Sequence, residues 1–453
     1  MINGAVTLPL DLAELSFTAS GDSLVRRTVL PSGVRILSER VPGARSATIG
    51  YWVAVGSRDE APETYGSTHF LEHLLFKGTA TRSALDIAVS FDAVGGEHNA
   101  MTAKEYTCYY AKVQDRDLPM AVEVIADMLT SSLLDPVEFE TERGVILEEL
   151  AMADDDPADA ASERFFEAVL GDHPLGRPIG GNPDTINAVT RDAVWQHYRA
   201  NYRAQDLVIT VAGAVDHDEL VAAVTTSLRQ ADWNLDTTDA PVARRSATGD
   251  LIQRGSALKV VQRPIEQANI LLGVEGIAAT DPRRATLTVL NSILGGGMSS
   301  RLFQEIREKR GLAYSVYSFT PSYSDAGLFG IYAGCAPGKI GQVAELMLSE
   351  FRRLGTDGVT EEEMRRASGQ LSGASALALE DSDTRMSRLG RSELTLGEFV
   401  DLDESLRRIA LVTPDGIREL ATELAARPLS ISAVGTIDEN TFTGLAESPT
   451  PAR

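Results

Sequence analysis

The second half of the chain repeats the order of segments found in the first half. Each strand-like or helix-like segment of the first half recurs about 220 residues later. The clearest pairs begin at Ile49 and Ile270, at Tyr106 and Gly327, at Val137 and Val359, and at Leu207 and Leu429. A period of this length is too long for a solenoid. We therefore expect an α+β protein in which two homologous α/β-sandwich domains arose by internal duplication.

The length of 453 residues also exceeds what one ordinary hydrophobic core supports. Between the two copies lies a polar stretch, 236–250, that is rich in residues that break helices and strands, and we interpret it as a linker. The expected organisation has five parts: an N-terminal tail at 1–23, a first domain at 24–235, the linker, a second domain at 251–441 and a C-terminal tail at 442–453.

The stretch from Gly66 to Gly78 contains two histidines and a glutamate at helical spacing. His69, Glu72 and His73 stand at positions i, i+3 and i+4, so on an α-helix their side chains share one face. Two imidazoles so placed can bind one metal ion while the carboxylate lies beside an open coordination position. His-x-x-Glu-His is the inverse of the commoner His-Glu-x-x-His zinc motif, and in both the Glu can deprotonate a metal-bound water. The alternative is that two of the six histidines fall on one helix by accident.

A zinc site needs a third protein ligand, which is usually presented by a distant helix. The segment 142–152 is expected to be helical, and Glu142 and Glu149 lie about two turns apart on one face of it. Glu148 competes as a ligand on spacing alone, but its helical phase does not match that of Glu142. Taken alone, these acids fit a solvated acidic helix face. Glu149 follows His73 by 76 residues.

Together these residues identify a resemblance to the pitrilysin/insulinase-type zinc metallopeptidases, also called inverzincins. The family pattern is His-x-x-Glu-His followed some 75 residues later by a Glu in a segment like 142–152. The resemblance implies one Zn²⁺ per chain, with His69, His73 and Glu149 as ligands and Glu72 as the general base. It also implies that Glu142 is a carboxylate that steadies the site. Thr68 stands where the family usually has Ala, a change that alters no ligand.

The second copy has lost the metal motif. Opposite the three expected ligands stand Thr286, Leu290 and Leu371. Opposite the expected base stands Val289. Arg307 and Tyr314 match an Arg and a Tyr that the family brings to its active site from the half without metal. The resemblance implies that they hold the scissile carbonyl, with the Tyr314 hydroxyl and Arg307 donating to the developing oxyanion. Without the family pattern, an exposed helix residue and an ordinary strand aromatic would be the better interpretation.

Substrate binding is expected on the strand that follows Gly96. An exposed sheet edge can take an extended peptide as an added strand. In the family this edge carries an Asn-Ala pair, which Asn99 and Ala100 match. The alternative is that Asn99 is a turn residue. We expect His98 to be a solvated neighbour of Asn99. The remaining histidines outside the motif have no partner at ligand spacing, and we expect them to be structural: His173, His197 and His217.

Composition and charge limit which partners and which cellular location the protein can have. The formal charge of −23 and the lack of a Lys/Arg cluster argue against nucleic-acid binding. The negative charge can serve solubility or attract basic peptides. Cys108 and Cys335 form no disulfide framework and have no metal-type spacing, which fits a reducing, cytoplasmic location. The N-terminus lacks the pattern of a signal or transit peptide, and no apolar run is long enough for a membrane span.

The resemblance extends from about Val25 to Ile437 and fits the mitochondrial-processing-peptidase-like bacterial branch, whose chains carry two such domains instead of four. It implies a zinc endopeptidase of the metalloendopeptidase class that hydrolyses unfolded peptides or presequence-like extensions inside a dimeric chamber. The partner would be a second copy of the chain or a paralogue. The alternative is a catalytically silent core or assembly subunit of the same fold.

Overall fold

The computed structural model describes residues 4–231, 233–246 and 252–446 of the chain. It contains two compact units, each built from separate stretches of sequence. The first unit takes in the chain up to Leu150, Pro178–Arg244 and Ala376–Glu404. The second takes in Ala151–Arg177, Arg245–Ser375 and the chain from Ser405. The elements are mixed helices and strands, which confirms the α+β class.

The first unit is organised around a seven-stranded sheet in the order β2-β3-β4-β8-β5-β7-β6. The strands are β2 (Glu14–Thr18), β3 (Leu24–Val29), β4 (Arg35–Arg40), β5 (Ser46–Val53), β6 (Glu97–Thr102), β7 (Thr107–Gln114) and β8 (Leu207–Gly213). Only the β4–β8 pair is parallel. Strands β5 and β8 are buried almost throughout, because they lie inside the sheet and helices cover both of its faces.

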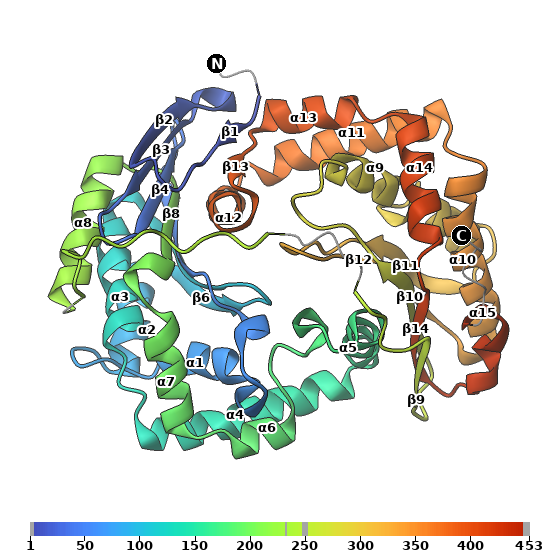
Figure 1. The fold of residues 1–453 in the computed structure, drawn as a ribbon, viewed down its shortest axis with the longest axis horizontal. Helices are drawn as coiled ribbons and strands as arrows, with labels where there is room; N and C mark the ends of the chain where they lie inside the picture. Colours follow the sequence, from blue (N-terminus) through green and yellow to red (C-terminus); the bar gives the residue numbers. More distant parts are fainter. Residues whose placement is uncertain (1–3, 232, 247–251, 447–453) are drawn as a thin grey trace. The chain divides into compact units, whose positions relative to one another are not determined.

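The helices of the first unit pack on opposite faces of this sheet (Figure 1). Helix α3 packs on β5 and β7, and α8 packs on α3. Helix α12 contacts β4, β5 and β8 from the other side. The helices are α1 (Ser67–Leu75), α2 (Ala84–Asp92), α3 (Leu118–Ser131), α4 (Pro136–Asp155), α6 (Pro183–Ala188), α7 (Arg191–Asn201), α8 (His217–Gln230) and α12 (Ser382–Arg391). Helix α4 leaves this unit after Leu150.

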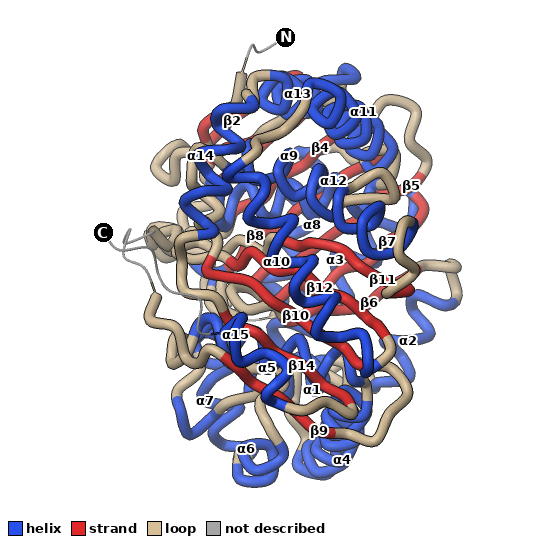
Figure 2. The backbone as a smooth tube through the Cα atoms, turned by 90° about the vertical axis from the view of Figure 1, so that its right-hand side faces the viewer, coloured by secondary structure: helices blue, strands red, loops and turns tan. Residues whose placement is uncertain are grey.

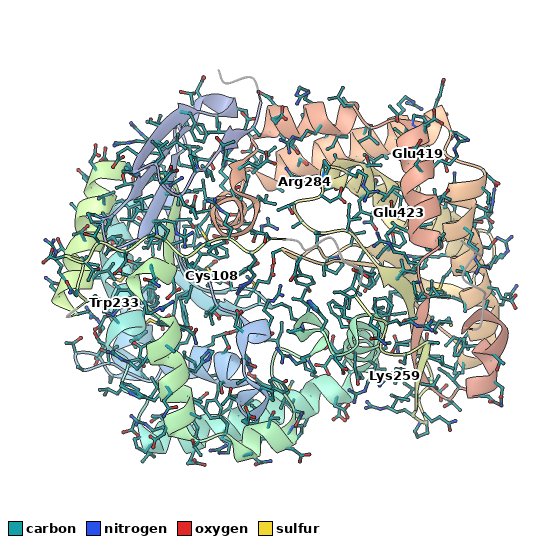
Figure 3. All side chains as sticks on the ribbon, viewed as in Figure 1. Cys108, Trp233, Lys259, Arg284, Glu419 and Glu423 are labelled. Atoms are coloured by element: carbon teal, nitrogen blue, oxygen red, sulfur yellow. The ribbon has the colours of Figure 1, made fainter. Side chains whose placement is uncertain are left out.

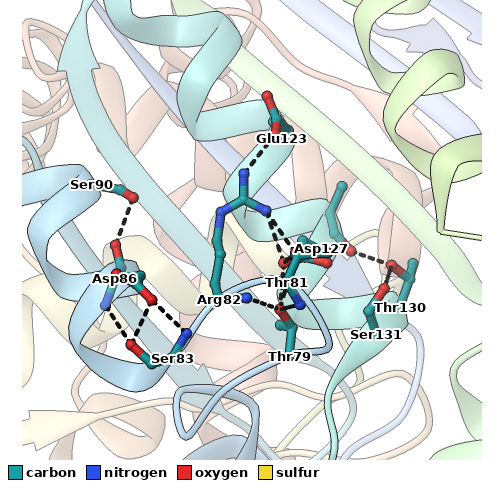
Figure 4. Close-up of polar contacts among 11 residues, drawn as sticks. Thr79, Thr81, Arg82, Ser83, Asp86, Ser90, Glu123, Asp127, Thr130 and Ser131 are labelled. Carbon is teal, nitrogen blue, oxygen red and sulfur yellow. Dashed lines mark hydrogen bonds and ion pairs between the residues drawn. The ribbon is translucent and has the colours of Figure 1, made fainter.

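The loop that follows α1 is fixed to α3 by polar contacts (Figure 4). Asp127 on α3 accepts hydrogen bonds from the Thr79 hydroxyl at 2.6 Å and from Arg82 at 2.9 Å. The other guanidinium nitrogen of Arg82 donates to Glu123 at 2.6 Å. Ser83 and Asp86 then form a capping box that begins α2. The C-terminal end of α1 is therefore held by a short, well-bonded connection.

The second unit contains a five-stranded sheet in the order β11-β12-β10-β14-β9. Figure 2 shows these strands side by side. They are β9 (Leu258–Gln262), β10 (Ala268–Glu275), β11 (Ala313–Phe319), β12 (Leu328–Cys335) and β14 (Ser430–Gly435). The main helices are α9 (Arg284–Gly295), α10 (Ile340–Thr356), α11 (Glu361–Ala378), α13 (Leu402–Ala410) and α14 (Pro414–Ala425). The order β14-β10-β12-β11 repeats the order β8-β5-β7-β6 of the first unit, as a duplication requires.

One helix from each half of the sequence packs on the sheet of the other half's unit. Helix α5 (Pro157–Leu170) packs on β10 and β14, where the Ser432 hydroxyl donates to the Ala161 carbonyl at 2.8 Å. Lys259 on β9, labelled in Figure 3, forms an ion pair with Glu167 of α5 at 3.1 Å. The expected contiguous domains, 24–235 and 251–441, therefore differ from the compact units, which exchange 151–177 and 376–404.

Helix α12 is the reciprocal case in the first unit. Its residue Gly390 lies against the ring of Trp52, and the carboxylate of Glu39 pairs with Arg385 at 2.6 Å and Arg388 at 2.9 Å. The Glu39 carboxylate is fully buried and the two arginine side chains are mostly buried, so these ion pairs tie α12 to the sheet. The sequence of neither helix shows which sheet it packs on. Amphipathicity shows that one face of a helix is buried, but not which element covers that face.

The chain ends contain more structure than the sequence suggests. The described part of the expected tail at 1–23 includes β2, which pairs with β3, and β1 (Val6–Thr7), which pairs with β13 (Glu398–Phe399). The expected linker runs as loop over 236–246, and 247–250 lie outside the described residues. The expected C-terminal tail includes α15 (Thr443–Ala446), and 447–453 lie outside the described residues. Within the described ranges, no helix is both long and apolar enough to cross a membrane.

Candidate metal centre

Two helices of the first unit bring three possible metal ligands together. His69 and His73 project from α1, and Glu149 projects from α4. The Glu149 carboxylate lies 3.7 Å from Nε2 of His69 and 3.4 Å from Nε2 of His73. Their ligand atoms all lie within 4.8 Å of one another. In the described part of the chain this is the one group of three such side chains, and the exposed Glu148 is outside it.

The start of α1 is fixed by a buried carboxylate. Glu60, 6% exposed, accepts hydrogen bonds from the backbone N–H of Gly66 at 2.8 Å and of Thr68 at 2.7 Å. A helix leaves such N–H donors unsatisfied at its first turn. A negative charge at this end also stabilises the helix by its interaction with the helix dipole. Gly66 itself has a φ of +91°, and a Cβ there would lie 2.5 Å from Ile186. Only glycine fits this entry to the helix.

A histidine from another helix also contacts α1. His197 on α7 faces the Thr68 hydroxyl with Nε2 at 3.1 Å and Asn201 with Nδ1 at 3.2 Å. Because the Asn201 amide donates to Nδ1, Nε2 carries the proton and donates to Thr68. Burial lowers the pKa of His197 to about 4, so its ring is neutral at pH 7. In the sequence, His197 is one more isolated histidine. No sequence pattern marks Glu60 as the residue that holds the start of α1.

The ring of His73 is oriented by a carboxylate behind it. Nδ1 of His73 lies 2.9 Å from Glu142, whose other oxygen lies 2.6 Å from Nζ of Lys77. Burial raises the pKa of Glu142, but hydrogen bonds from Lys77 and His73 outweigh it, and the net pKa is lowered. The ionised carboxylate can only accept, so Nδ1 of His73 donates to Glu142, and Nε2 is the ring nitrogen that faces Glu149. The sequence pairs Glu142 with the site but does not identify Lys77.

The imidazole of His69 is neutral at pH 7. Burial, with a smaller contribution from His73 and against the effect of Glu149, lowers its pKa to about 4. Two imidazoles and one carboxylate are a donor set that suits a divalent zinc ion. In a tetrahedral zinc site with bonds of about 2.0–2.1 Å, neighbouring ligand atoms lie about 3.4 Å apart. The separations of 3.7 and 3.4 Å between the Glu149 carboxylate and the two histidine nitrogens are close to that value.

Glu72 lies on the same face of α1, one turn after His69. Its Oε2 accepts a hydrogen bond from the hydroxyl of Thr102, the last residue of β6. The structure gives this carboxylate no second hydrogen bond among the described residues, so Oε1 is open. Below it, burial and to a smaller extent the charge of Glu72 raise the pKa of the Cys108 thiol. Thr102 was not among the predicted site residues, because nothing in its sequence context distinguishes it.

Strand β6, which contains Asn99 and Ala100, is the edge strand of the seven-stranded sheet. Asn99 is exposed and Ala100 half-buried, and the Asn99 side chain accepts from the Ala100 N–H at 2.8 Å. Asn99 pairs with Tyr110 inside the strand, so it is not the turn residue of the alternative interpretation. His98, expected to be solvated, is half-buried and stacks on Phe91 with ring centroids 4.3 Å apart, a packing role that needs no ligand.

Arg307 and Tyr314 lie together in the second unit. Arg307 is in the π-helical turn η7 (Phe303–Glu308), and Tyr314 is on the edge strand β11. The Arg307 guanidinium lies over the Tyr314 ring, 5.1 Å from its centroid, and over the Phe303 ring at 4.7 Å. Tyr314 is 81% exposed, which is unusual for a large aromatic side chain. In the same unit Val289 and Leu290 are core residues of α9, as the loss of the motif implies.

Two family profiles cover most of the chain. The profile described as insulinase (peptidase family M16) matches residues 35–183, and the profile described as peptidase M16 inactive domain matches residues 188–371. Curated relatives are similar along nearly their whole length. An uncharacterised zinc protease of Streptomyces coelicolor is 49% identical, over 92% of this chain and 91% of its own. One of Bacillus subtilis is 38% identical, over 91% and 98%.

Solved structures share the fold at lower identity. A peptidase M16 inactive domain protein from Pseudomonas fluorescens superimposes with a TM-score of 0.82 at 19% identity, covering 91% of this chain and 97% of its own. A protease from Helicobacter pylori gives a TM-score of 0.79 at 21% identity, covering 92% and 100%. With relatives this close in sequence and this complete in coverage, the chain belongs to the insulinase-type peptidase family M16.

Proposed function

We propose that the chain is a zinc-dependent endopeptidase of the metalloendopeptidase class. The observation that carries the proposal is the meeting of His69, His73 and Glu149, with Glu72 open on the same face of α1. One Zn²⁺ per chain would be held by the two Nε2 atoms and the Glu149 carboxylate. The names of the curated relatives, zinc proteases, support the same metal.

The bound metal would supply Lewis acidity toward water and toward the scissile carbonyl. Oε1 of Glu72 would take a proton from the attacking water and pass it to the leaving amine. Glu142 would keep His73 in the tautomer that presents Nε2. Following the family resemblance, we propose that Arg307 and Tyr314 donate to the oxyanion, a role supported by their contact and by the exposure of Tyr314.

The substrate would be an unfolded peptide or a presequence-like extension. Edge strand β6 can pair with an extended backbone, and Asn99 and Ala100 lie on it. An unfolded peptide has its backbone N–H and C=O groups free for this pairing along its whole length, which supports unfolded chains as the substrate. The charge of −23 favours basic peptides by long-range attraction.

We further propose that two copies of the chain pair around a chamber. Sedimentation of the purified protein should then give twice the chain mass of 48.7 kDa. A monomer that becomes active only with a related second chain would instead support the paralogue pairing. A stable monomer with full activity would contradict both.

Zinc content and cleavage test the enzyme proposal together. The purified protein should contain one equivalent of zinc and cleave a quenched peptide. Glu149→Gln should lose zinc, and Glu72→Gln should keep zinc but lose cleavage. Glu148→Gln, an exposed change on the same helix, is the matched control and should keep both. A wild-type chain without stoichiometric zinc would favour the silent assembly subunit, and turnover by Glu72→Gln would contradict the role of that residue.

A further inference from the structure

We propose that Thr102 is a positioning residue for Glu72, an inference that rests on the proposed function. The hydroxyl of Thr102 donates to Oε2 of Glu72, while Oε1 has no hydrogen bond among the described residues. One oxygen is therefore anchored and the other is left to exchange a proton. Of the hydroxyls that the structure describes, this is the one that contacts the carboxylate.

The anchor is itself rigid. Thr102 is 9% exposed and is the last residue of β6, where its backbone pairs with Thr107 across the hairpin. A β-branched side chain in a strand has few rotamers, so its hydroxyl is held in one direction. Glu72, by contrast, has three side-chain torsions and sits half-buried on a helix. Without the hydroxyl, its carboxylate would sample several rotamers, of which only some face the metal ligands.

The placement also joins the base to the edge strand. Residues of one strand alternate between faces, so Thr102 shares its face with Ala100 and not with Asn99. Helix α1 packs on β6, and Thr102 provides the polar contact between this strand and the expected base. The same rigid strand would then position both a peptide that pairs with β6 and the Glu72 carboxylate that acts on it. A general base works only when it is within hydrogen-bond reach of the proton that it takes.

The test compares Thr102→Val, which keeps the shape and removes the hydroxyl, with Thr102→Ser, which keeps the hydroxyl. In the zinc-loaded protein we expect Thr102→Val to lower kcat about tenfold with little change in KM or zinc content. Thr102→Ser should recover most of the loss. Thr107→Val is the matched control: it removes the neighbouring hydroxyl, which donates to the Val55 carbonyl at 3.0 Å. It should reduce stability and leave kcat per bound zinc unchanged.

Thermal unfolding of the zinc-free protein provides a second readout that does not depend on activity. Thr102→Val should lower Tm in the presence of Glu72 and have no such effect in a Glu72→Ala background, because the contact is then already lost. Equal losses in both backgrounds, or a Thr102→Val enzyme with wild-type kcat, would overturn the proposal. A wild-type protein that binds no zinc would reject the proposed function, and with it the role of Thr102, even if the Tm cycle confirmed the contact.

Discussion

Replacing Glu142 by Gln is the sharpest test of how the protein prepares His73 for metal. Both oxygens of Glu142 are engaged, one by Nδ1 of His73 at 2.9 Å and the other by Lys77 at 2.6 Å, and the side chain is 3% exposed. Glutamine keeps the size but has one acceptor. If its oxygen faces His73, its NH₂ group faces the Lys77 ammonium, and two donors meet in a buried place.

The expected cost follows from this geometry. Loss of a carboxylate behind a metal-binding histidine weakens metal affinity about 10–100-fold, equal to about 1.4–2.7 kcal/mol. We expect the upper part of that range, because the variant disturbs both His73 and Lys77. The ligands themselves remain, so the stoichiometry should stay at one zinc per chain.

Competition against a fluorescent zinc chelator measures this directly. Glu148→Gln removes the same charge from an exposed position of α4 and should leave the zinc Kd unchanged. Glu149→Gln sets the scale for loss of a true ligand. A Glu142→Gln protein whose zinc Kd is within twofold of wild type would refute the orienting role, provided that Glu149→Gln has lost zinc.

Two further predictions concern stability. Gly390→Ala should destabilise the fold by about 1–3 kcal/mol, because its Cβ would lie 2.4 Å from the buried ring of Trp52. Gly373→Ala, where nothing lies within 4 Å, is the control in urea unfolding and should be neutral or stabilising. For His197, burial lowers the pKa from 6.5 to about 4, so the folded state binds the proton less readily than the unfolded state. The contribution of His197 to the stability of the zinc-free protein should be full above pH 6.5 and fall by about 3 kcal/mol toward pH 4, in addition to the loss from His69. His197→Gln should remove that part of the slope, and an unchanged slope would contradict the assignment.

The parts of the site that the sequence predicts are those with a fixed spacing. Helical geometry alone places His69, Glu72 and His73 on one face, and it places Glu142 on the face of Glu149. The distance between α1 and α4 is a tertiary fact, and only the family resemblance anticipated it. Lys77, Glu60 and Thr102 were missed because their partners come from other elements, and common residue types reveal such contacts only in three dimensions.

The fold shows the same division. The bounds of helix α5, Pro157–Leu170, are marked locally in the sequence, by Pro at its start and Gly after its end. Strand β2 was missed, because its five residues carry no apolar run and depend on pairing with β3. The repeated strand order followed from the duplication, whereas the exchange of α5 and α12 did not. Each of the two homologous sheets has an equivalent face that a helix must cover. The sequence does not show which half of the chain supplies that helix.

The exchange of α12 has a consequence for biosynthesis. The last strand of the first sheet, β8, is complete at Gly213, but the helix that covers the Trp52 face of that sheet ends at Arg391, which is 391 − 213 = 178 residues later. A ribosome adds about 5–20 residues per second, so that face stays bare for roughly ten to forty seconds of translation. During this time the nascent chain offers Trp52 and its apolar neighbours to chaperones or to other unfinished copies. Slower translation of the residues between β8 and α12 would lengthen this exposure in proportion.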